Sequence, residues 1–176
     1  MRNERMPDLM RMIILLIALA VFPVATMATG PVEFSFRSLD GRTITSNELR
    51  GKVVVLAFGA SWLPLSRTQV QGVQRLADDY RNRGVEVFWV SIDSESPKSK
   101  NYASDDQLKD FARRYSLTVP VLRDPEGAVS RRLGVDQLPA IVIIDRGGNI
   151  AGAPIGGLDP KGDLVGQLAA RLESLL

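Results

Sequence analysis

Few side chains of this chain could do chemistry, because its 176 residues include no cysteine and no histidine. The absence of cysteine removes disulfides, thiolate nucleophiles and thiolate-bound metals. The absence of histidine removes the usual general base and the commonest metal ligand. Ser66 would be a nucleophile only beside a base, and no carboxylate lies close to it in sequence. We therefore expect Ser66 to cap a helix or to fill space.

Acidic residues gather near the middle of the chain, at Asp93, Glu95, Asp105 and Asp106. Their spacing matches no EF-hand loop, so we expect no metal and no cofactor.

The polar segment 93–104 follows a predicted buried strand. Ligands of open α/β sheets gather at the carboxyl ends of the strands. Lys98, Lys100 and Tyr102 could therefore border a binding groove. The favoured alternative is a mobile, solvated loop.

The elements that must position these residues alternate between strands and helices. Apolar runs predict strands at 32–36, 52–58, 85–92, 119–122, 140–144 and 150–155. Apolar stripes at helical spacing predict a helix over 65–83, one after Ser104 and one at the C-terminus, with a short helix over 127–133. Asp159 is expected to cap the last helix, with Pro160 in its first turn. Together with an Asp-Gly turn at 40–41, which predicts an extra N-terminal β-hairpin, the pattern indicates an α/β fold with a central mixed sheet flanked by helices.

The N-terminus has the three parts of a secretory signal. Arg2, Arg5 and Arg11 precede an apolar run over 12–25, and small residues follow up to Ala28. The run is shorter than the roughly 20 residues that a spanning helix needs. We expect residues 1–28 to be a signal peptide, or else an uncleaved membrane anchor, and residues 29–176 to form one domain. Either alternative places the domain in the periplasm or on the outer face of the cytoplasmic membrane.

The charge of the chain disfavours nucleic acid as a partner. The formal net charge is only +2, and no long run of one sign occurs. Phosphate binding needs a concentrated basic surface. We therefore expect no nucleic-acid partner, and a membrane contact only through an uncleaved anchor.

Four local motifs occur in a characteristic order: NELRGKVVV at 47–55, ASWLPLSR at 60–67, VEVFWVSID at 85–93, and LGVDQLPA at 133–140 followed by an apolar strand. In this order they resemble the TlpA/ResA-type thioredoxin-like family of the redoxin (AhpC/TSA) group. The resemblance covers nearly all of the chain after residue 31. It implies a thioredoxin-like fold.

The departures from the family pattern cluster where its chemistry lies. Leu63 and Ser66 stand at the positions of the two cysteines of the family's Cys-x-x-Cys turn. Gln69 stands where the family often has glutamate, and Gly59 replaces an aromatic residue. A leucine side chain cannot ionise, attack sulfur or carry electrons. We therefore expect a redox-inactive, non-enzymatic relative with no catalytic residues.

The resemblance implies that the Leu138–Pro139 bond is cis and faces the active-site turn. Trp62, Leu63, Pro64, Leu138 and Pro139 would then form an exposed patch that binds an extended segment of another envelope protein. The alternatives are that Pro139 serves only folding and that Leu63 tucks inward. At the level of function, the alternatives are a thiol–disulfide oxidoreductase of the cytochrome c maturation type, a peroxiredoxin-like antioxidant enzyme, or a purely structural scaffold subunit. The oligomeric state is not indicated.

Overall fold

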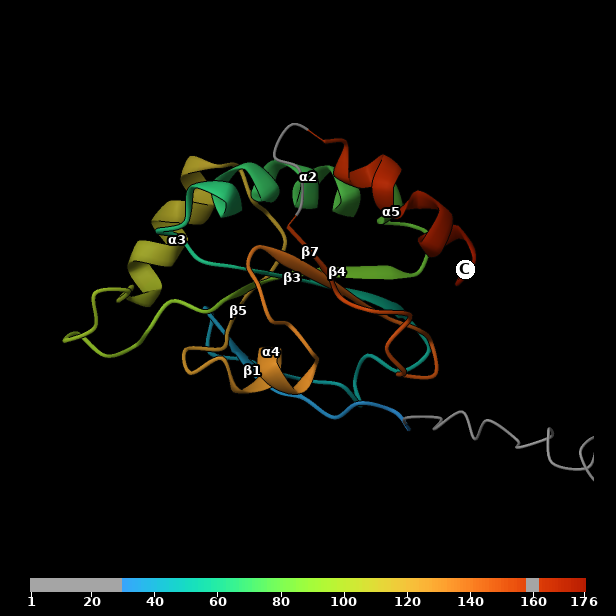
Figure 1. Ribbon diagram of the computed structural model, residues 1–176, viewed down its shortest axis with the longest axis horizontal. Coiled ribbons are helices and arrows are strands. Elements are labelled where there is room, and N and C mark those ends of the chain that lie inside the picture. Colours follow the sequence, from blue (N-terminus) through green and yellow to red (C-terminus); the bar gives the residue numbers. More distant parts are fainter. Residues whose placement is uncertain (1–29, 158–161) are drawn as a thin grey trace, which may run out of the picture.

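The computed structural model describes residues 30–157 and 162–176 and is shown in Figure 1. A seven-stranded mixed sheet runs through the molecule in the order β2-β1-β5-β4-β3-β6-β7. The strands are β1 (Ser35–Ser38), β2 (Thr43–Thr45), β3 (Val53–Gly59), β4 (Val85–Ser91), β5 (Val121–Arg123), β6 (Ala140–Ile144) and β7 (Ile155–Gly156). β1 and β2 pair antiparallel as a hairpin at one edge. The predicted α/β fold with an extra N-terminal hairpin is therefore confirmed.

Helices cover both faces of the sheet. They are α2 (Pro64–Tyr80), α3 (Asp105–Arg114), α4 (Ala128–Arg132) and α5 (Leu164–Glu173). In Figure 1, α2, α3 and α5 lie above the sheet and α4 lies below it. None of the helices in the described ranges is long and apolar enough to cross a membrane.

The buried strand β3 divides the core into two layers, because its side chains alternate between the faces of the sheet. Val53, Val55 and Ala57 pack in the layer under α2, α3 and α5. Val54, Leu56 and Phe58 pack in the opposite layer, with residues from β1 and α4. Every residue of β3 is buried. Burial on both faces explains why its sequence is a continuous apolar run rather than an alternating one.

The strand directions bring three segments to one edge of the sheet. β3 runs parallel to β4, and Gly59 lies opposite Ser91 at their carboxyl ends. β6 runs antiparallel to β3, and Phe58 pairs with Ala140 at the start of β6. The turn after β3, the loop after β4 and the segment before β6 must therefore lie close together. They contain the positions that the sequence singled out.

The helix ends agree with the prediction in one place and differ in two. Ser104 and Gln107 form the predicted capping box of α3. α2 ends at Tyr80, three residues before the predicted end, and the chain turns before Gly84, whose φ is +78°. The predicted cap of the last helix was wrong. Asp163 caps α5 by accepting a hydrogen bond from the Val165 N–H, and residues 159 and 160 lie outside the described residues.

Three shorter predicted strands are shifted or broken. β1 begins at Ser35 rather than at residue 32, and β5 begins at Val121 rather than at residue 119. The predicted strand over 150–155 is interrupted. Only a single bridge joins Ile144 to Ile150 before the chain leaves the sheet, and pairing resumes at β7. The chain turns here at Gly152, whose φ of +82° is a conformation that glycine adopts readily because it has no side chain.

Candidate functional site

The turn between β3 and α2 is held by a buried carboxylate from the neighbouring strand end. Asp93 is fully buried. Its two oxygens accept hydrogen bonds from the Ser61 N–H (2.9 Å), the Ser61 hydroxyl (2.6 Å) and the Ser91 hydroxyl (2.7 Å). The side chain therefore fixes the backbone just before Trp62. The sequence drew attention to Asp93 as an acidic residue, but not to this positioning role.

Leu63 and Ser66, the two positions of interest in this turn, differ in exposure. Leu63 is half-buried and is the N-cap residue of α2, and Ser66 is completely buried in its first turn. The Ser66 hydroxyl accepts a hydrogen bond from the Ala60 N–H at 3.0 Å. The prediction that Ser66 caps the helix is therefore wrong, because the N-cap residue is Leu63 and the Ser66 hydroxyl bonds to the preceding turn. Ser66 closes the preceding turn, and no carboxylate within the described residues hydrogen-bonds to its hydroxyl.

A small polar cluster lies beneath the turn, around Gly59. A Cβ atom at Gly59 would lie 2.8 Å from Ser66 Oγ, 3.0 Å from Trp89 Nε1 and 3.1 Å from Gln69 Oε1. Trp89 and Ser66 are fully buried, and Gln69 is nearly so. Position 59 is therefore glycine because three polar atoms occupy the space of a side chain. The sequence analysis noted that Gly59 replaces an aromatic residue of the family pattern. It did not predict that the indole of Trp89 reaches this position.

The segment before β6 meets the turn from the other side. The Leu138–Pro139 peptide bond is cis. The Gln69 Nε2 amide donates a hydrogen bond to the Ala140 carbonyl (3.3 Å), which ties α2 to the residue after this bond. Leu138 is half-buried against the lower core layer, and Pro139 is buried. The exposed surface at these positions is therefore smaller than predicted, because Pro139 is buried and Leu138 is half-buried.

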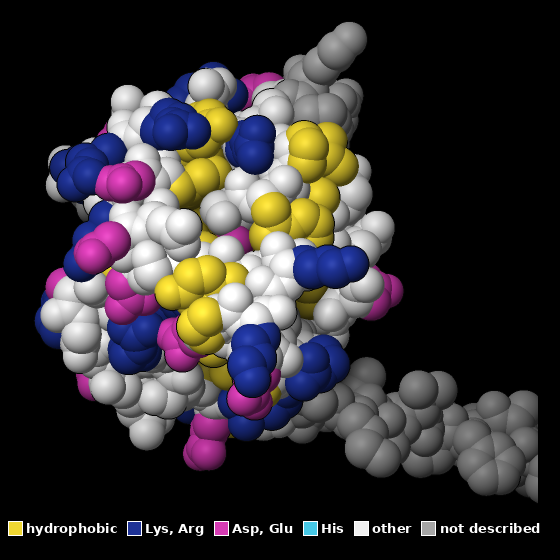
Figure 2. All heavy atoms as spheres, turned by 90° about the vertical axis from the view of Figure 1, so that its left-hand side faces the viewer, with side chains coloured by type: hydrophobic (Ala, Val, Ile, Leu, Met, Phe, Trp, Pro, Cys, Tyr) yellow, Lys and Arg dark blue, Asp and Glu magenta, His cyan; other side chains and the backbone are white. Residues whose placement is uncertain are grey.

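Exposed apolar side chains remain on this edge of the molecule. Trp62 is 43% exposed, Leu65 39% and Tyr102 38%, and Pro64 is also exposed. Figure 2 views the molecule from the side on which α3 and the start of α2 lie in Figure 1. Apolar side chains reach this surface in several patches, with lysine and arginine side chains between and around them.

The loop over 93–104 is anchored by two arginines. Arg123, nearly fully buried, donates to Glu95 (3.2 Å) and to the Ala103 carbonyl (3.0 Å). Arg37 donates to Glu95 and to Asp105, each at 2.6 Å. Hydrogen bonds from Arg37 lower the pKa of both carboxyl groups.

These contacts bear on the two expectations for the acidic residues and the loop. The two ends of the loop are joined to each other by a bridge between Ser94 and Tyr102, and the part between them contains Lys98 and Lys100, both exposed. Glu95 and Asp105 already have arginine partners. Within the described ranges, no group of three or more acidic residues is placed to hold a metal ion.

Two hollows flank the turn and the cis bond, one on each face of the sheet. One, of about 270 Å³, lies between α2 and α3 and includes Ser61 and Arg67. The other, of about 400 Å³, lies beside α4 and includes Leu138.

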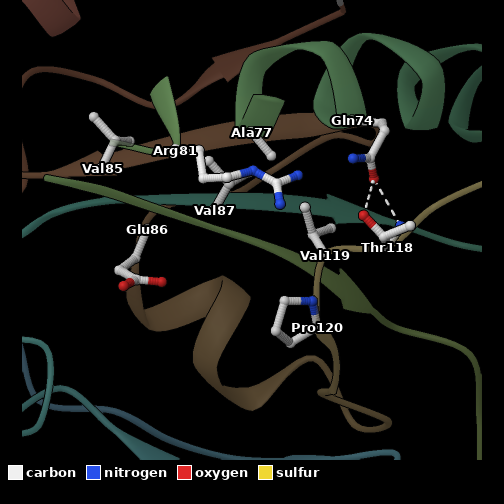
Figure 3. Close-up of a pocket in the computed structure, with 9 residues that line it drawn as sticks. All are labelled: Gln74, Ala77, Arg81, Val85, Glu86, Val87, Thr118, Val119 and Pro120. Carbon is white, nitrogen blue, oxygen red and sulfur yellow. Dashed lines mark hydrogen bonds between the residues drawn. The ribbon is translucent and has the colours of Figure 1, made fainter. Parts of the chain in front are cut away.

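A third hollow, of about 300 Å³, lies at the opposite end of the sheet, near the start of β4 (Figure 3). Arg81 reaches across it, and Gln74 holds Thr118 at its rim. Its charged residues are already paired, Arg81 with Asp78 and Glu86 with Lys52. It therefore offers no free charge to a ligand.

The fold and the site together define a thioredoxin-like domain without its thiols. The sheet carries a turn and helix start with a half-buried Leu63 and a buried Ser66, and the Leu138–Pro139 bond before β6 is cis. The sequence profile of the AhpC/TSA family matches residues 28–153, and the chain belongs to this family.

Individual relatives agree with this assignment. The thiol-disulfide oxidoreductase ResA of Geobacillus thermodenitrificans is 30% identical over 127 residues, which cover 72% of this chain and 67% of the relative. ResA of Bacillus thuringiensis is 27% identical, and the chain spans 63% of its length. Among solved structures, the pneumococcal exposed lipoprotein thioredoxin Etrx1 of Streptococcus pneumoniae superposes with a TM-score of 0.64 at 25% identity, covering 81% of this chain and 99% of that protein.

Proposed function

We propose that this protein is a redox-inactive binding module of the cell envelope, which holds an extended segment of another envelope protein. The segment would lie along the edge formed by Trp62, Leu63, Pro64, Leu138 and Pro139. The module needs no cofactor.

Redox inactivity follows from the chemistry of the residues present. Thiol–disulfide exchange begins with attack by a thiolate, and a second thiol completes it. Leu63 supplies no nucleophile, and Ser66 is buried with its hydroxyl engaged by the Ala60 N–H. The oxidoreductase activity in the names of the relatives therefore has no counterpart among the side chains of this site. A peroxiredoxin-like peroxidase activity meets the same obstacle, since it too begins with a thiolate.

The observation that carries the binding role is the backbone of Leu138. Within residues 30–157 and 162–176, no hydrogen bond engages its N–H or its carbonyl. Unpaired backbone groups beside exposed apolar side chains suit the addition of an extended peptide, in which main-chain bonds give affinity and side-chain contacts give specificity. Trp62 is the natural anchor, because exposed tryptophan is enriched among the residues that dominate binding energy.

Export is supported by the N-terminal sequence. The basic residues, the apolar run over 12–25 and the small residues before Ala28 form a secretory signal or an anchor. The chain's similarity to an exposed lipoprotein thioredoxin agrees with an envelope location. This chain has no cysteine to carry a lipid, so it would be held only by an uncleaved N-terminal segment.

Photo-crosslinking in living cells tests the proposal. A benzoylphenylalanine at position 63 should give a discrete adduct with one envelope protein, and the same probe at Thr43, on the far edge of the sheet, should not. Leu63→Asp should abolish co-purification of that protein by placing a charge among apolar contacts.

Equal crosslinking from both positions, or unchanged co-purification after Leu63→Asp, would favour a scaffold role for the fold instead. Turnover of insulin disulfides or of hydrogen peroxide by the purified protein would refute redox inactivity.

A further inference from the structure

The hollow between α2 and α3 carries positive charge directly beside the proposed binding edge. It is lined by Ser61, Arg67, Gln107, Asp110, Phe111, Arg114 and Tyr115. Ser61 precedes Trp62, and Arg67 holds the turn by donating its Nε–H to the Ser61 carbonyl at 3.3 Å. A segment lying on Trp62 and Leu63 would therefore pass the mouth of this hollow.

Among the residues that the structure describes, the two guanidinium groups of the hollow have no carboxylate partner. No ion pair reaches Arg67 or Arg114 from the part of the chain that the structure describes. The one acidic residue of the hollow, Asp110, is paired with Arg113, which lies outside it. Arg67 and Arg114 are both exposed. Two unpaired arginines can bind one carboxylate through several charge-assisted hydrogen bonds.

The hollow on the other face of the sheet has the opposite balance of charge. Beside Leu138 it presents Glu126 and Asp136, against the single guanidinium of Arg131. Arg131 donates to the Glu126 backbone carbonyl, and neither carboxylate has an ion-pair partner within the described residues. An acidic side chain is therefore attracted on the α2–α3 side of the edge and repelled on the α4 side.

We propose that the bound segment carries an aspartate or glutamate side chain, which enters the hollow between Arg67 and Arg114 when an apolar residue of the same segment covers Trp62 and Leu63. The partner is thus an acidic, extended peptide segment, and the unequal charge of the two hollows fixes its direction. This inference rests on the proposed function, because it describes the segment that the same edge would hold.

A peptide-display selection tests the composition of that segment. The purified protein, from residue 29 onward, is used to select from a library of random dodecapeptides at low ionic strength. The same selection is run on Leu63→Asp, on the double variant Arg67→Gln/Arg114→Gln, and on the control Arg75→Gln/Arg132→Gln. The control removes two exposed arginines that also lack ion pairs with the described residues but line neither hollow.

The wild type and the control should enrich peptides with an acidic residue at a fixed distance from an apolar one. The Arg67→Gln/Arg114→Gln variant should keep the apolar residue and lose the acidic one. Synthesised peptides should bind that variant about three- to fivefold more weakly than the wild type, as expected for exposed ion pairs. The difference should shrink in high salt.

The possible failures separate the two proposals. Enrichment of apolar peptides without an acidic residue, or an acidic preference that survives in the Arg67→Gln/Arg114→Gln variant, would overturn the present inference and leave the binding module intact. If no peptide is enriched in a way that depends on Leu63, the binding module itself fails.

Discussion

Restoring two cysteines at positions 63 and 66 should produce a dithiol that closes into a disulfide. The backbone of the turn is intact: the Leu63 N–H donates to the Ala60 carbonyl and the Ser66 N–H to the Leu63 carbonyl, each at 3.1 Å. A half-buried first position and a buried second position suit an attacking thiol and a resolving one. At the start of α2, the thiol at position 63 should have a pKa below about 8.5, because the helix N-terminus favours thiolate.

The contacts around position 66 set the expected changes in the free energy of unfolding of this double variant. Replacing the Ser66 hydroxyl by the weak acceptor sulfur loosens the bond from the buried Ala60 N–H, which should cost about 1–3 kcal/mol in the reduced form. Closing a four-residue ring restricts the unfolded chain and should restore about 2 kcal/mol. The oxidised double variant should therefore be about as stable as the wild type, and the reduced one should be less stable.

The measurement is unusually clean because the chain has no other cysteine. The Leu63→Cys/Ser66→Cys variant is equilibrated in glutathione buffers, and free thiols are counted by maleimide labelling and mass. Urea denaturation of each form then gives the two free energies of unfolding. A matched control is Leu63→Cys/Leu65→Cys, whose thiols two residues apart do not face each other. Failure of the first pair to close under any oxidising condition, or closure of both pairs alike, would refute the inference that the turn geometry has been retained.

Three further changes probe the surroundings of the turn. Gly59→Ala should lower the free energy of unfolding by about 1–2 kcal/mol in urea denaturation, because the added carbon would lie within 3.1 Å of three polar atoms, and an unchanged stability would show that the cluster yields. Asp93→Asn should cost about 1.5–3 kcal/mol in the same assay, because the amide cannot accept all the hydrogen bonds that the carboxylate accepts, and an unchanged stability would contradict the role of Asp93 in holding the turn. Arg37 lowers the pKa of Glu95, so the ion pair contributes to the free energy of unfolding above the ordinary pKa of 4.5, and this contribution is lost as the pH falls through the pKa of Glu95 in the folded protein. Arg37→Gln should therefore reduce the loss of stability on acidification, measured by urea denaturation as a function of pH. An unaltered pH dependence would contradict the ion pair.

The order of the elements could be predicted because each apolar pattern reports burial directly. The run over 52–58 became β3, buried on both faces, and the run over 140–144 became β6 with the expected bounds. Element ends were less predictable. The start of α5 depends on the side chain of Asp163, and an aspartate four residues earlier carries the same signal. A single sequence offers no means of choosing between two equivalent caps.

The candidate site was predictable only where local sequence determines it. The positions of Leu63, Ser66 and the proline loop followed from order along the chain. The contacts that hold them did not, because they join residues far apart in sequence. Asp93 reaches Ser61 across 32 residues and Gln69 reaches Ala140 across 71. Such pairs emerge only when strand order is known.

These long-range contacts explain how the edge keeps its shape without sulfur. Asp93 holds the beginning of the turn, the Ser66 hydroxyl holds its middle, and Gln69 joins α2 to the start of β6. None of the three donors or acceptors changes with the redox state of the surroundings, unlike a pair of thiols that opens and closes. The surface beside Leu138 is therefore presented in one form under oxidising and reducing conditions alike. That constancy agrees with the proposed binding role, since a binding edge whose shape followed the redox state would gain and lose its ligand with each cycle.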